Sequence, residues 1–312
     1  MTHGVDLRVR FGAVELANPV LTASGTSGYG QELAGLTSLS ALGGLVTKGI
    51  SPRPRAGNST PRICEAAAGM INSIGLENVG VDGFARDKLP FLRGCGTRVI
   101  VNFFGETEDE YVECAAALCA AARAAGGGVD ALEMNISCPN VKKGGVEFGT
   151  DPGVAGDLVR ACRAVCDRPL WVKLTPNITD IVALARAVVD AGADGLSMIN
   201  TVSAMAIDAR ARRPRIATVF GGLSGPAIKP IALRMVYQVA RAGLGVPICG
   251  IGGVASGTDA AEFLVAGASA VQVGTQTFVE PGAAARVARE LEAFCVAERL
   301  GSAAELVGTL RL

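Results

Sequence analysis

The sequence predicts an α/β protein folded as one eight-stranded TIM (β/α)8 barrel over residues 1–312. Short Val/Ile-rich runs alternate with longer Ala/Leu/Arg segments of helical period, which is typical of parallel strands joined by crossover helices. Eight such runs follow one another along the chain, and 312 residues suit one large barrel. A doubly wound open sheet is the alternative, but that fold does not need eight consecutive units of similar size.

The strands are predicted where apolar runs end in Gly, Asn, Ser or Thr, at 19–25, 45–49, 99–105, 131–137, 170–175, 195–200, 247–253 and 270–275. Helices are predicted between them, at 106–125, 151–167, 178–191, 226–242, 256–266 and 282–299. Residues 7–16 alternate around Gly12 and predict a hairpin that caps the barrel bottom. Segments 50–98 and 201–225 exceed one crossover helix, so we expect inserted loops on the catalytic face.

Composition narrows the class of partner. The 29 basic and 29 acidic residues balance, so no charge excess points to nucleic acid or to an anionic membrane, and a small-molecule partner is favoured. No apolar stretch resembles a signal peptide or a membrane span, so we expect a cytoplasmic protein. The nine cysteines form no Cys-x-x-Cys pair, which favours reduced thiols, with Cys162 and Cys166 in the core.

Polar residues stand at the ends of otherwise apolar strands. In a TIM barrel these ends converge on one mouth, so a single pocket ringed by lysine, asparagine and serine side chains is expected. The residues concerned are Ser24, Lys48, Asn102, Asn135, Lys173 and Asn200. Any one of them alone is as compatible with a strand cap or loop anchor as with a site. Six on six strands favour a site.

Glycines follow the last two strands, at Gly252, Gly253 and Gly274, and Thr275 comes next. Backbone N–H groups at such turns approach a phosphate closely, which favours a phosphate site over simple tight turns. The Gly-rich segment 220–225 lies on the same predicted face.

Cys138 is the one cysteine predicted to lie on a loop over the barrel mouth, in the run Asn135-Ile136-Ser137-Cys138-Pro139-Asn140. A thiol of ordinary pKa about 8.5 can serve there as a base or as a nucleophile, and an unreactive loop cysteine is the remaining alternative. The lone histidine, His3, lies near the terminus. No cluster has metal-ligand spacing, so no metal is expected.

Five segments at these strand ends carry a resemblance that runs in order over nearly the whole chain. They are Asn18 to Gly25, Thr47-Lys48-Gly49, Met70 to Asn78, Asn135 to Asn140, and Gly221 to Gly225. Together they resemble the dihydroorotate dehydrogenases. The resemblance implies oxidation of (S)-dihydroorotate to orotate in pyrimidine biosynthesis, with Cys138 taking a proton from C5 while FMN N5 accepts hydride from C6.

The resemblance also implies two sets of binding residues. The FMN set is Ser24, Lys48, Gly49, Asn102, Asn135, Lys173, Ile199, Gly225, Gly252, Gly253, Gly274 and Thr275, with the last four at the phosphate. The orotate set is Lys48, Asn72, Ser73, Ile74, Gly75, Leu76, Asn135, Asn140, Asn200 and Thr201. Lysine suits the ligand carboxylate, and amides suit its imide edges because they both donate and accept.

Segment 140–152, which follows Cys138, resembles the catalytic subunit of the NAD-dependent class 1B branch. That likeness implies a separate electron-transfer subunit carrying FAD and a [2Fe-2S] cluster, and a homodimer within a heterotetramer. The chain itself shows neither a dinucleotide fingerprint nor clustered cysteines. The alternatives are a fumarate-dependent class 1A enzyme, another FMN-dependent dihydropyrimidine oxidoreductase, and a non-redox barrel that binds a phosphate ligand.

Overall fold

Eight parallel strands close into a barrel at the centre of the protein, as described by a computed structural model for residues 4–137, 142–143 and 146–312. In chain order the barrel strands are β3 (Val20–Thr22), β4 (Gly44–Val46), β7 (Arg98–Phe103), β8 (Ala131–Asn135), β11 (Leu170–Leu174), β12 (Gly195–Met198), β17 (Ile248–Ile251) and β18 (Ala270–Val273). Each begins within one residue of its predicted start. The predicted TIM barrel is confirmed, and the alternative of an open sheet is wrong.

Six long helices pack around the barrel, each one to three residues shorter at either end than predicted. They are α4 (Glu108–Ala124), α5 (Pro152–Val165), α6 (Ile181–Asp190), α7 (Lys229–Arg241), α8 (Gly257–Val265) and α10 (Ala283–Ala297). Side-chain oxygens of Thr107, Asp151, Asp180 and Ser256 accept N–H bonds from the first turns of α4, α5, α6 and α8. These N-caps satisfy donors that a helix start leaves unpaired, which fixes where each helix begins.

The first two connections use only short helical pieces. Between β3 and β4 these are α1 (Gln31–Ala34) and the 3₁₀ turn Leu39–Ala41. Before β7, α2 (Gly80–Gly83), a π-helical turn (Phe84–Lys88) and α3 (Leu89–Leu92) run in succession. Shorter elements elsewhere are β9 (Lys142–Lys143), β10 (Val146–Glu147), the 3₁₀ turns Pro226–Ile228 and Ala303–Leu306, and α9 (Gln276–Val279).

The predicted N-terminal hairpin closes the bottom of the barrel. Strands β1 (Val9–Phe11) and β2 (Val14–Leu16) pair antiparallel around Gly12, whose φ of 60° suits the turn. The Phe11 ring lies 4.3 Å from the Trp171 ring, centroid to centroid, and both side chains are fully buried. Together with the lower halves of the strands, the hairpin forms an apolar plug.

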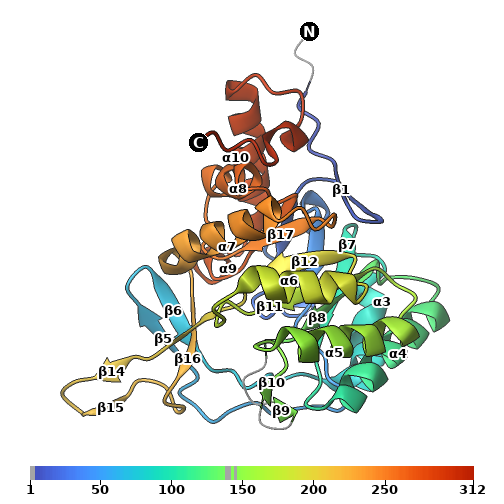
Figure 1. Ribbon diagram of the computed structural model, residues 1–312, viewed down its shortest axis with the longest axis vertical. Helices are drawn as coiled ribbons and strands as arrows, with labels where there is room; N and C mark the ends of the chain where they lie inside the picture. Colours follow the sequence, from blue (N-terminus) through green and yellow to red (C-terminus); the bar gives the residue numbers. More distant parts are fainter. Residues whose placement is uncertain (1–3, 138–141, 144–145) are drawn as a thin grey trace.

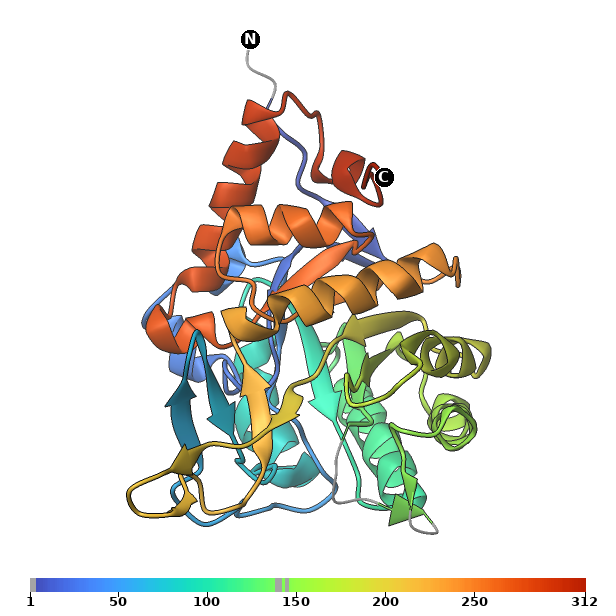
Figure 2. The same cartoon turned by 60° about the vertical axis from the view of Figure 1, so that its left-hand side comes forward.

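The two long insertions lie over the cavity at the carboxyl ends of the barrel strands, as predicted, and they also carry a second sheet that the sequence did not predict. Four antiparallel strands lie in the order β13 (Val202–Ala204), β16 (Gly221–Ser224), β6 (Gly69–Asn72) and β5 (Ile63–Ala66). A small hairpin, β14 (Ile207–Asp208) and β15 (Arg213–Pro214), extends from this sheet. Figure 2 shows the blue strands of the first insertion beside the gold strand of the second. In Figure 1 the sheet lies at the lower left, away from β1.

The cysteines pack as the composition suggested. The eight cysteines of the described residues are all free, and Cys162 and Cys166 are buried. Burial raises the pKa of the Cys162 thiol to about 12, so the thiol stays protonated at neutral pH. No helix in the described parts of the chain is long and apolar enough to cross a membrane.

Candidate active site

A cavity of about 1500 Å³ opens at the carboxyl ends of the barrel strands, beneath the inserted sheet. This volume exceeds the usual range for one small ligand, roughly 300–1,000 Å³, and leaves room for a cofactor and a substrate together. The predicted site residues that line it are Ser24, Lys48, Gly49, Asn72, Ser73, Ile74, Gly75, Leu76, Asn102, Asn135, Lys173, Ile199, Asn200, Thr201, Gly225, Gly252, Gly253, Gly274 and Thr275. The two remaining predicted residues, Cys138 and Asn140, lie outside the described residues.

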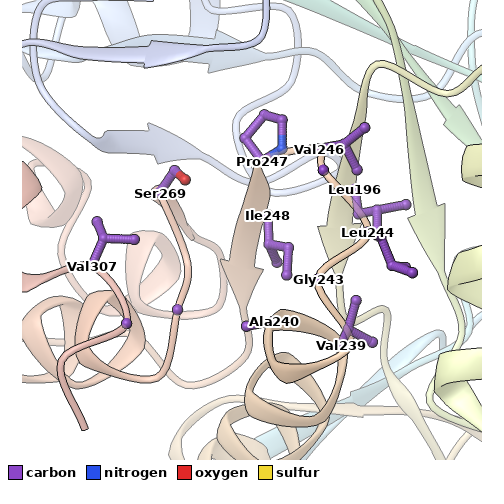
Figure 3. Close-up of a pocket in the computed structure, with 13 residues that line it drawn as sticks. Leu196, Val239, Ala240, Gly243, Leu244, Val246, Pro247, Ile248, Ser269 and Val307 are labelled. Atoms are coloured by element: carbon purple, nitrogen blue, oxygen red, sulfur yellow. The ribbon is translucent and has the colours of Figure 1, made fainter.

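A second cavity, of about 240 Å³, lies at the opposite end of the barrel (Figure 3). It sits beside the starts of β12 and β17, where Leu196, Pro247 and Ile248 face it. Ser269 contributes the one polar side chain of its lining. Without charged or titratable groups this cavity offers no chemistry, so the larger one is the candidate active site.

Asparagine amides on neighbouring strands are fixed by hydrogen bonds at the cavity wall. Asn200 Nδ2 donates to Asn135 Oδ1 over 3.1 Å, and the Ser137 N–H donates to the same oxygen over 3.2 Å. The Tyr111 hydroxyl holds the backbone of Asn135 by donating to its carbonyl over 2.7 Å. Asn200 Oδ1 in turn accepts from the Thr201 N–H over 2.8 Å. These bonds orient the amides before any ligand arrives.

Lys48 brings a half-buried cation to the cavity. Burial lowers the pKa of its ammonium group, although the nearby Glu77 carboxylate opposes that effect. The backbone of Lys48 is held by an N–H bond to the Gly28 carbonyl over 2.8 Å. A partly desolvated cation gains more from an anionic partner than an exposed one does, so this position favours a ligand with a carboxylate or phosphate.

The segment from Asn72 to Leu76 is held from both sides. Asn72 Nδ2 donates to the Gly222 carbonyl of the inserted sheet over 3.2 Å. The Ile74 carbonyl accepts from the Asn58 N–H over 2.9 Å. Gly75 has a φ of 75°, and a Cβ at this position would lie 2.5 Å from the Asn58 backbone nitrogen. Only glycine therefore fits this turn, which shapes one wall of the cavity.

Glycine turns that follow two strands, β16 and β17, meet at the opposite wall. Gly225, Gly252 and Gly253 have φ values of 95°, 130° and 75°. A Cβ on Gly253 would lie 2.9 Å from the Gly225 carbonyl oxygen, so the turns touch backbone to backbone. Thr275 Oγ1 bonds Ser224 Oγ over 2.8 Å and joins the last strand to this wall. Such a cradle exposes backbone N–H groups to a bound anion.

A layer of buried polar side chains forms the floor between the cavity and the apolar plug. Lys173 Nζ donates to Ser24 Oγ over 3.1 Å and lies 3.8 Å from Glu133 Oε1. Glu133 is fully buried. Its Oε1 accepts from Asn102 Nδ2 over 2.7 Å, and its Oε2 accepts from Ser197 Oγ over 2.6 Å and from Gln272 Nε2 over 2.7 Å.

Glu133 is not among the residues that the sequence predicts for the site. The available signal was one carboxylate inside the apolar run from Ala131 to Met134, because an acid in the middle of a buried strand needs specific partners. Glu133 also affects Cys249. Burial and, to a smaller extent, the charge of Glu133 raise the pKa of the Cys249 thiol well above its usual value. Among the described residues, no group of His, Cys, Asp and Glu is arranged to hold a metal ion.

Comparison with known proteins gives consistent matches over nearly the full length. The family model described as dihydroorotate dehydrogenase matches residues 6–295. A protein of Trichlorobacter lovleyi named dihydroorotate dehydrogenase B (NAD(+)), catalytic subunit, is 56% identical over 97% of this chain and 98% of its own length. Proteins with the same name from Pelobacter propionicus and Geobacter sulfurreducens are each 54% identical over 98% of this chain, and over 98% and 99% of their own lengths.

Proposed function

Because this chain belongs to the dihydroorotate dehydrogenase family, we propose that it is a catalytic subunit that oxidises (S)-dihydroorotate to orotate in pyrimidine biosynthesis. One observation carries the proposal beyond the family likeness. A single cavity combines a half-buried lysine, a buried lysine, fixed asparagine amides and a glycine cradle. These groups match a carboxylated pyrimidine beside a flavin phosphate. We extend the proposal to residues 1–312 as one FMN-binding domain.

The chemistry of the cavity residues fits FMN. Twelve residues hold it in this proposal: Ser24, Lys48, Gly49, Asn102, Asn135, Lys173, Ile199, Gly225, Gly252, Gly253, Gly274 and Thr275. The glycine cradle supports the assignment, because side chains at Gly225 and Gly253 would collide with backbone atoms and close the approach to the N–H groups. The buried ammonium group of Lys173 supports it too, since a reduced flavin ring is anionic and needs a cation.

The substrate occupies the rest of the cavity. Its carboxylate pairs with Lys48. Its ring edges pair with the side-chain amides of Asn72, Asn135, Asn140 and Asn200. The remaining residues of this wall are Ser73, Ile74, Gly75, Leu76 and Thr201. The hydrogen bond from Asn200 to Asn135 supports this assignment, because it aims both amides before binding and so reduces the entropy lost on binding.

Cys138 acts as the base that removes the proton from C5 of dihydroorotate. Bound FMN supplies the hydride acceptor for the hydrogen on C6. The neighbouring residue supports the position of the base, since Ser137 lines the cavity and its hydroxyl donates to the Lys173 carbonyl over 3.3 Å. Proton abstraction beside a carbonyl requires a base poised close to the substrate, and the thiolate form of a cysteine meets that requirement.

We further propose that electrons leave through a separate electron-transfer subunit carrying FAD and a [2Fe-2S] cluster, within a heterotetramer built on a dimer of this chain. The relatives support a partner because they are named catalytic subunits of an NAD(+) enzyme. A cytoplasmic location stays a prediction from the sequence.

The first test is optical. Purified protein supplied with FMN is expected to absorb near ~450 nm and to bleach when dihydroorotate is added without oxygen, as a flavin accepting hydride does. Dihydrouracil, which lacks the carboxylate, serves as the control and is expected to bleach it far more slowly. Protein that stays colourless with added FMN would contradict the proposal, and equal bleaching by both compounds would favour a different dihydropyrimidine as substrate.

The role of Cys138 is tested by Cys138→Ala. We expect FMN binding to persist and the rate of flavin reduction at neutral pH to fall by about 10²–10⁴-fold, the usual contribution of a general base. Stopped-flow absorbance measures this rate. Cys95→Ala, which removes a half-buried thiol outside the cavity lining, is the control and should reduce at the wild-type rate. Undiminished reduction in Cys138→Ala would contradict the assignment.

A further inference from the structure

Glu133 is a buried carboxylate that the reaction proposed above does not use. It is fully buried inside the barrel, where apolar side chains normally fill the space. Removing a carboxylate from water is costly unless charged and hydrogen-bonding partners compensate. Glu133 has such partners on four other strands, and two of them, Asn102 and Lys173, line the cavity on the far side.

We propose that Glu133 is a positioning residue that offsets the charge of Lys173 and thereby sets the reduction potential of the flavin. This inference rests on the proposed function, because it requires FMN in the cavity. Glu133 itself does not line the cavity and so acts through its neighbours.

The geometry connects the carboxylate to the cavity by two routes. On one, Lys173 Nζ lies 3.8 Å from Glu133 Oε1 while also donating to Ser24 Oγ, so the ammonium group is held between the carboxylate and the cavity wall. On the other, Asn102 Nδ2 donates to Oε1, which leaves the amide oxygen of Asn102 on the side of Gly49. Glu133 thus fixes the cation and the amide at once.

The opposite oxygen anchors the carboxylate itself. Ser197 and Gln272 both donate to Oε2, from β12 and β18. Three neutral donors and one cation therefore surround the carboxylate and provide partners for both of its oxygens. The negative charge offsets the ammonium charge of Lys173, so the cavity receives less positive potential than an isolated lysine would give.

Glu133→Gln removes this charge with little change of shape. The charge of Lys173 is then no longer offset, which stabilises the anionic reduced flavin relative to the oxidised form. The ratio of the FMN dissociation constants, oxidised over reduced, should therefore rise by at least about tenfold, given the strength of charge interactions in a buried site. For a two-electron couple a tenfold ratio raises the midpoint potential by about 30 mV. A redox titration with indicator dyes measures the potential.

The structure offers a way to accommodate the new amide. Gln272 Oε1 is buried without a hydrogen-bond partner, so turning the Gln272 amide would let that oxygen accept from the side-chain amide introduced by Glu133→Gln. Ser197→Ala is the matched control because it removes one hydrogen bond to the same carboxylate and keeps the charge. Its potential should stay close to that of the wild type, whereas a purely structural role would move both variants alike.

A second pair of variants gives the same comparison if Glu133→Gln alone folds poorly. Lys173→Met leaves the carboxylate charge uncompensated and should lower the potential. Adding Glu133→Gln to Lys173→Met should raise it again. Equal potentials in wild type and Glu133→Gln, or no rise in the double variant over Lys173→Met, would overturn this role while leaving the proposed function intact. Wild-type protein that binds no FMN would overturn both.

Discussion

Single side chains at the cavity carry charge in places that water reaches poorly. Lys48 is half-buried, and its pKa is lowered because burial disfavours the charged ammonium group. Lys173 is almost completely buried and is stabilised by Glu133. One lysine is therefore left for a ligand to neutralise, while the other is already paired. In our proposal this difference suits Lys48 to the substrate carboxylate and Lys173 to the reduced flavin.

The lowered pKa of Lys48 predicts a pH dependence of substrate binding. The charged form of Lys48 exists below its pKa, so affinity for the anionic product orotate should fall as pH rises through that value. Because burial lowers this pKa below the 10.5 that is usual for lysine, the loss should begin at a lower pH than an exposed lysine would show. Isothermal titration calorimetry of orotate across pH 7–11 measures this loss.

Lys48→Met is the matched variant, since it keeps the length of the side chain and removes the charge. It should bind orotate about tenfold to a hundredfold more weakly at pH 7, the usual value of a charge-assisted hydrogen bond, with a flat profile over the same range. Wild-type affinity that stays constant to the top of the range would contradict the assignment of Lys48 to the carboxylate.

At this scale the sequence predicted the residues that line the cavity but not the buried carboxylate beneath them. Residues such as Lys173 and Asn200 stand at strand ends, where the barrel topology alone brings them together. Glu133 depends on Asn102, Ser197 and Gln272, which lie 31, 64 and 139 residues away in the chain. No local pattern encodes such a set of partners, so one polar residue in an apolar strand was the whole signal.

Among the elements, the strands and helices that repeat along the chain could be predicted from the sequence. Barrel strands and helices recur with the same pattern, and caps such as Ser256 mark their starts. The inserted sheet has short strands, and Asn72 in β6 pairs with Gly222 in β16, 150 residues later. Strands of three or four residues at that separation carry too little alternation to be recognised, so the sequence predicts only loops there.

For the hairpin at the barrel bottom we predict that a substitution changes the stability of the protein without changing FMN binding. Phe11→Ala should lower the free energy of unfolding by about 3–5 kcal/mol, because it leaves a cavity against Trp171 in the apolar plug. FMN affinity should remain that of the wild type, since the plug lies at the other end of the barrel. Urea unfolding and flavin titration measure the two quantities.

Arg10→Ala is the control for that experiment. Arg10 lies between two buried hairpin residues but points to solvent, so its removal should change the free energy of unfolding by less than about 0.5 kcal/mol. Equal effects of the two substitutions would show that the hairpin contributes no packing of its own to the barrel.

The molecule as a whole is layered along the barrel axis, with an apolar plug, a polar floor and the cavity above it. In our proposal hydride leaves the substrate within that cavity and NAD+ is reduced elsewhere. The purified chain should therefore reduce its FMN with dihydroorotate and pass electrons to an artificial dye, yet form NADH only when the partner subunit is added.

NADH absorbance under anaerobic conditions measures this requirement, and dye reduction by the same sample is the control for a competent flavin. NADH formation by the purified chain at the rate of dye reduction would contradict a separate electron-transfer subunit. Dye reduction that also requires the partner would contradict the proposal that this chain performs the oxidation by itself.

The inserted sheet has a consequence for how such an enzyme can diverge. Strand β6 leads into the proposed pyrimidine wall at Asn72, and strand β16 leads into the proposed phosphate cradle at Gly225. The two backbones touch, since a Cβ on Gly69 would lie 2.1 Å from the Ser224 carbonyl oxygen. A substitution that reshapes one wall therefore shifts the other. Family members that bind a different pyrimidine should therefore carry paired changes on both strands. Transferring one strand alone between such members should weaken FMN binding.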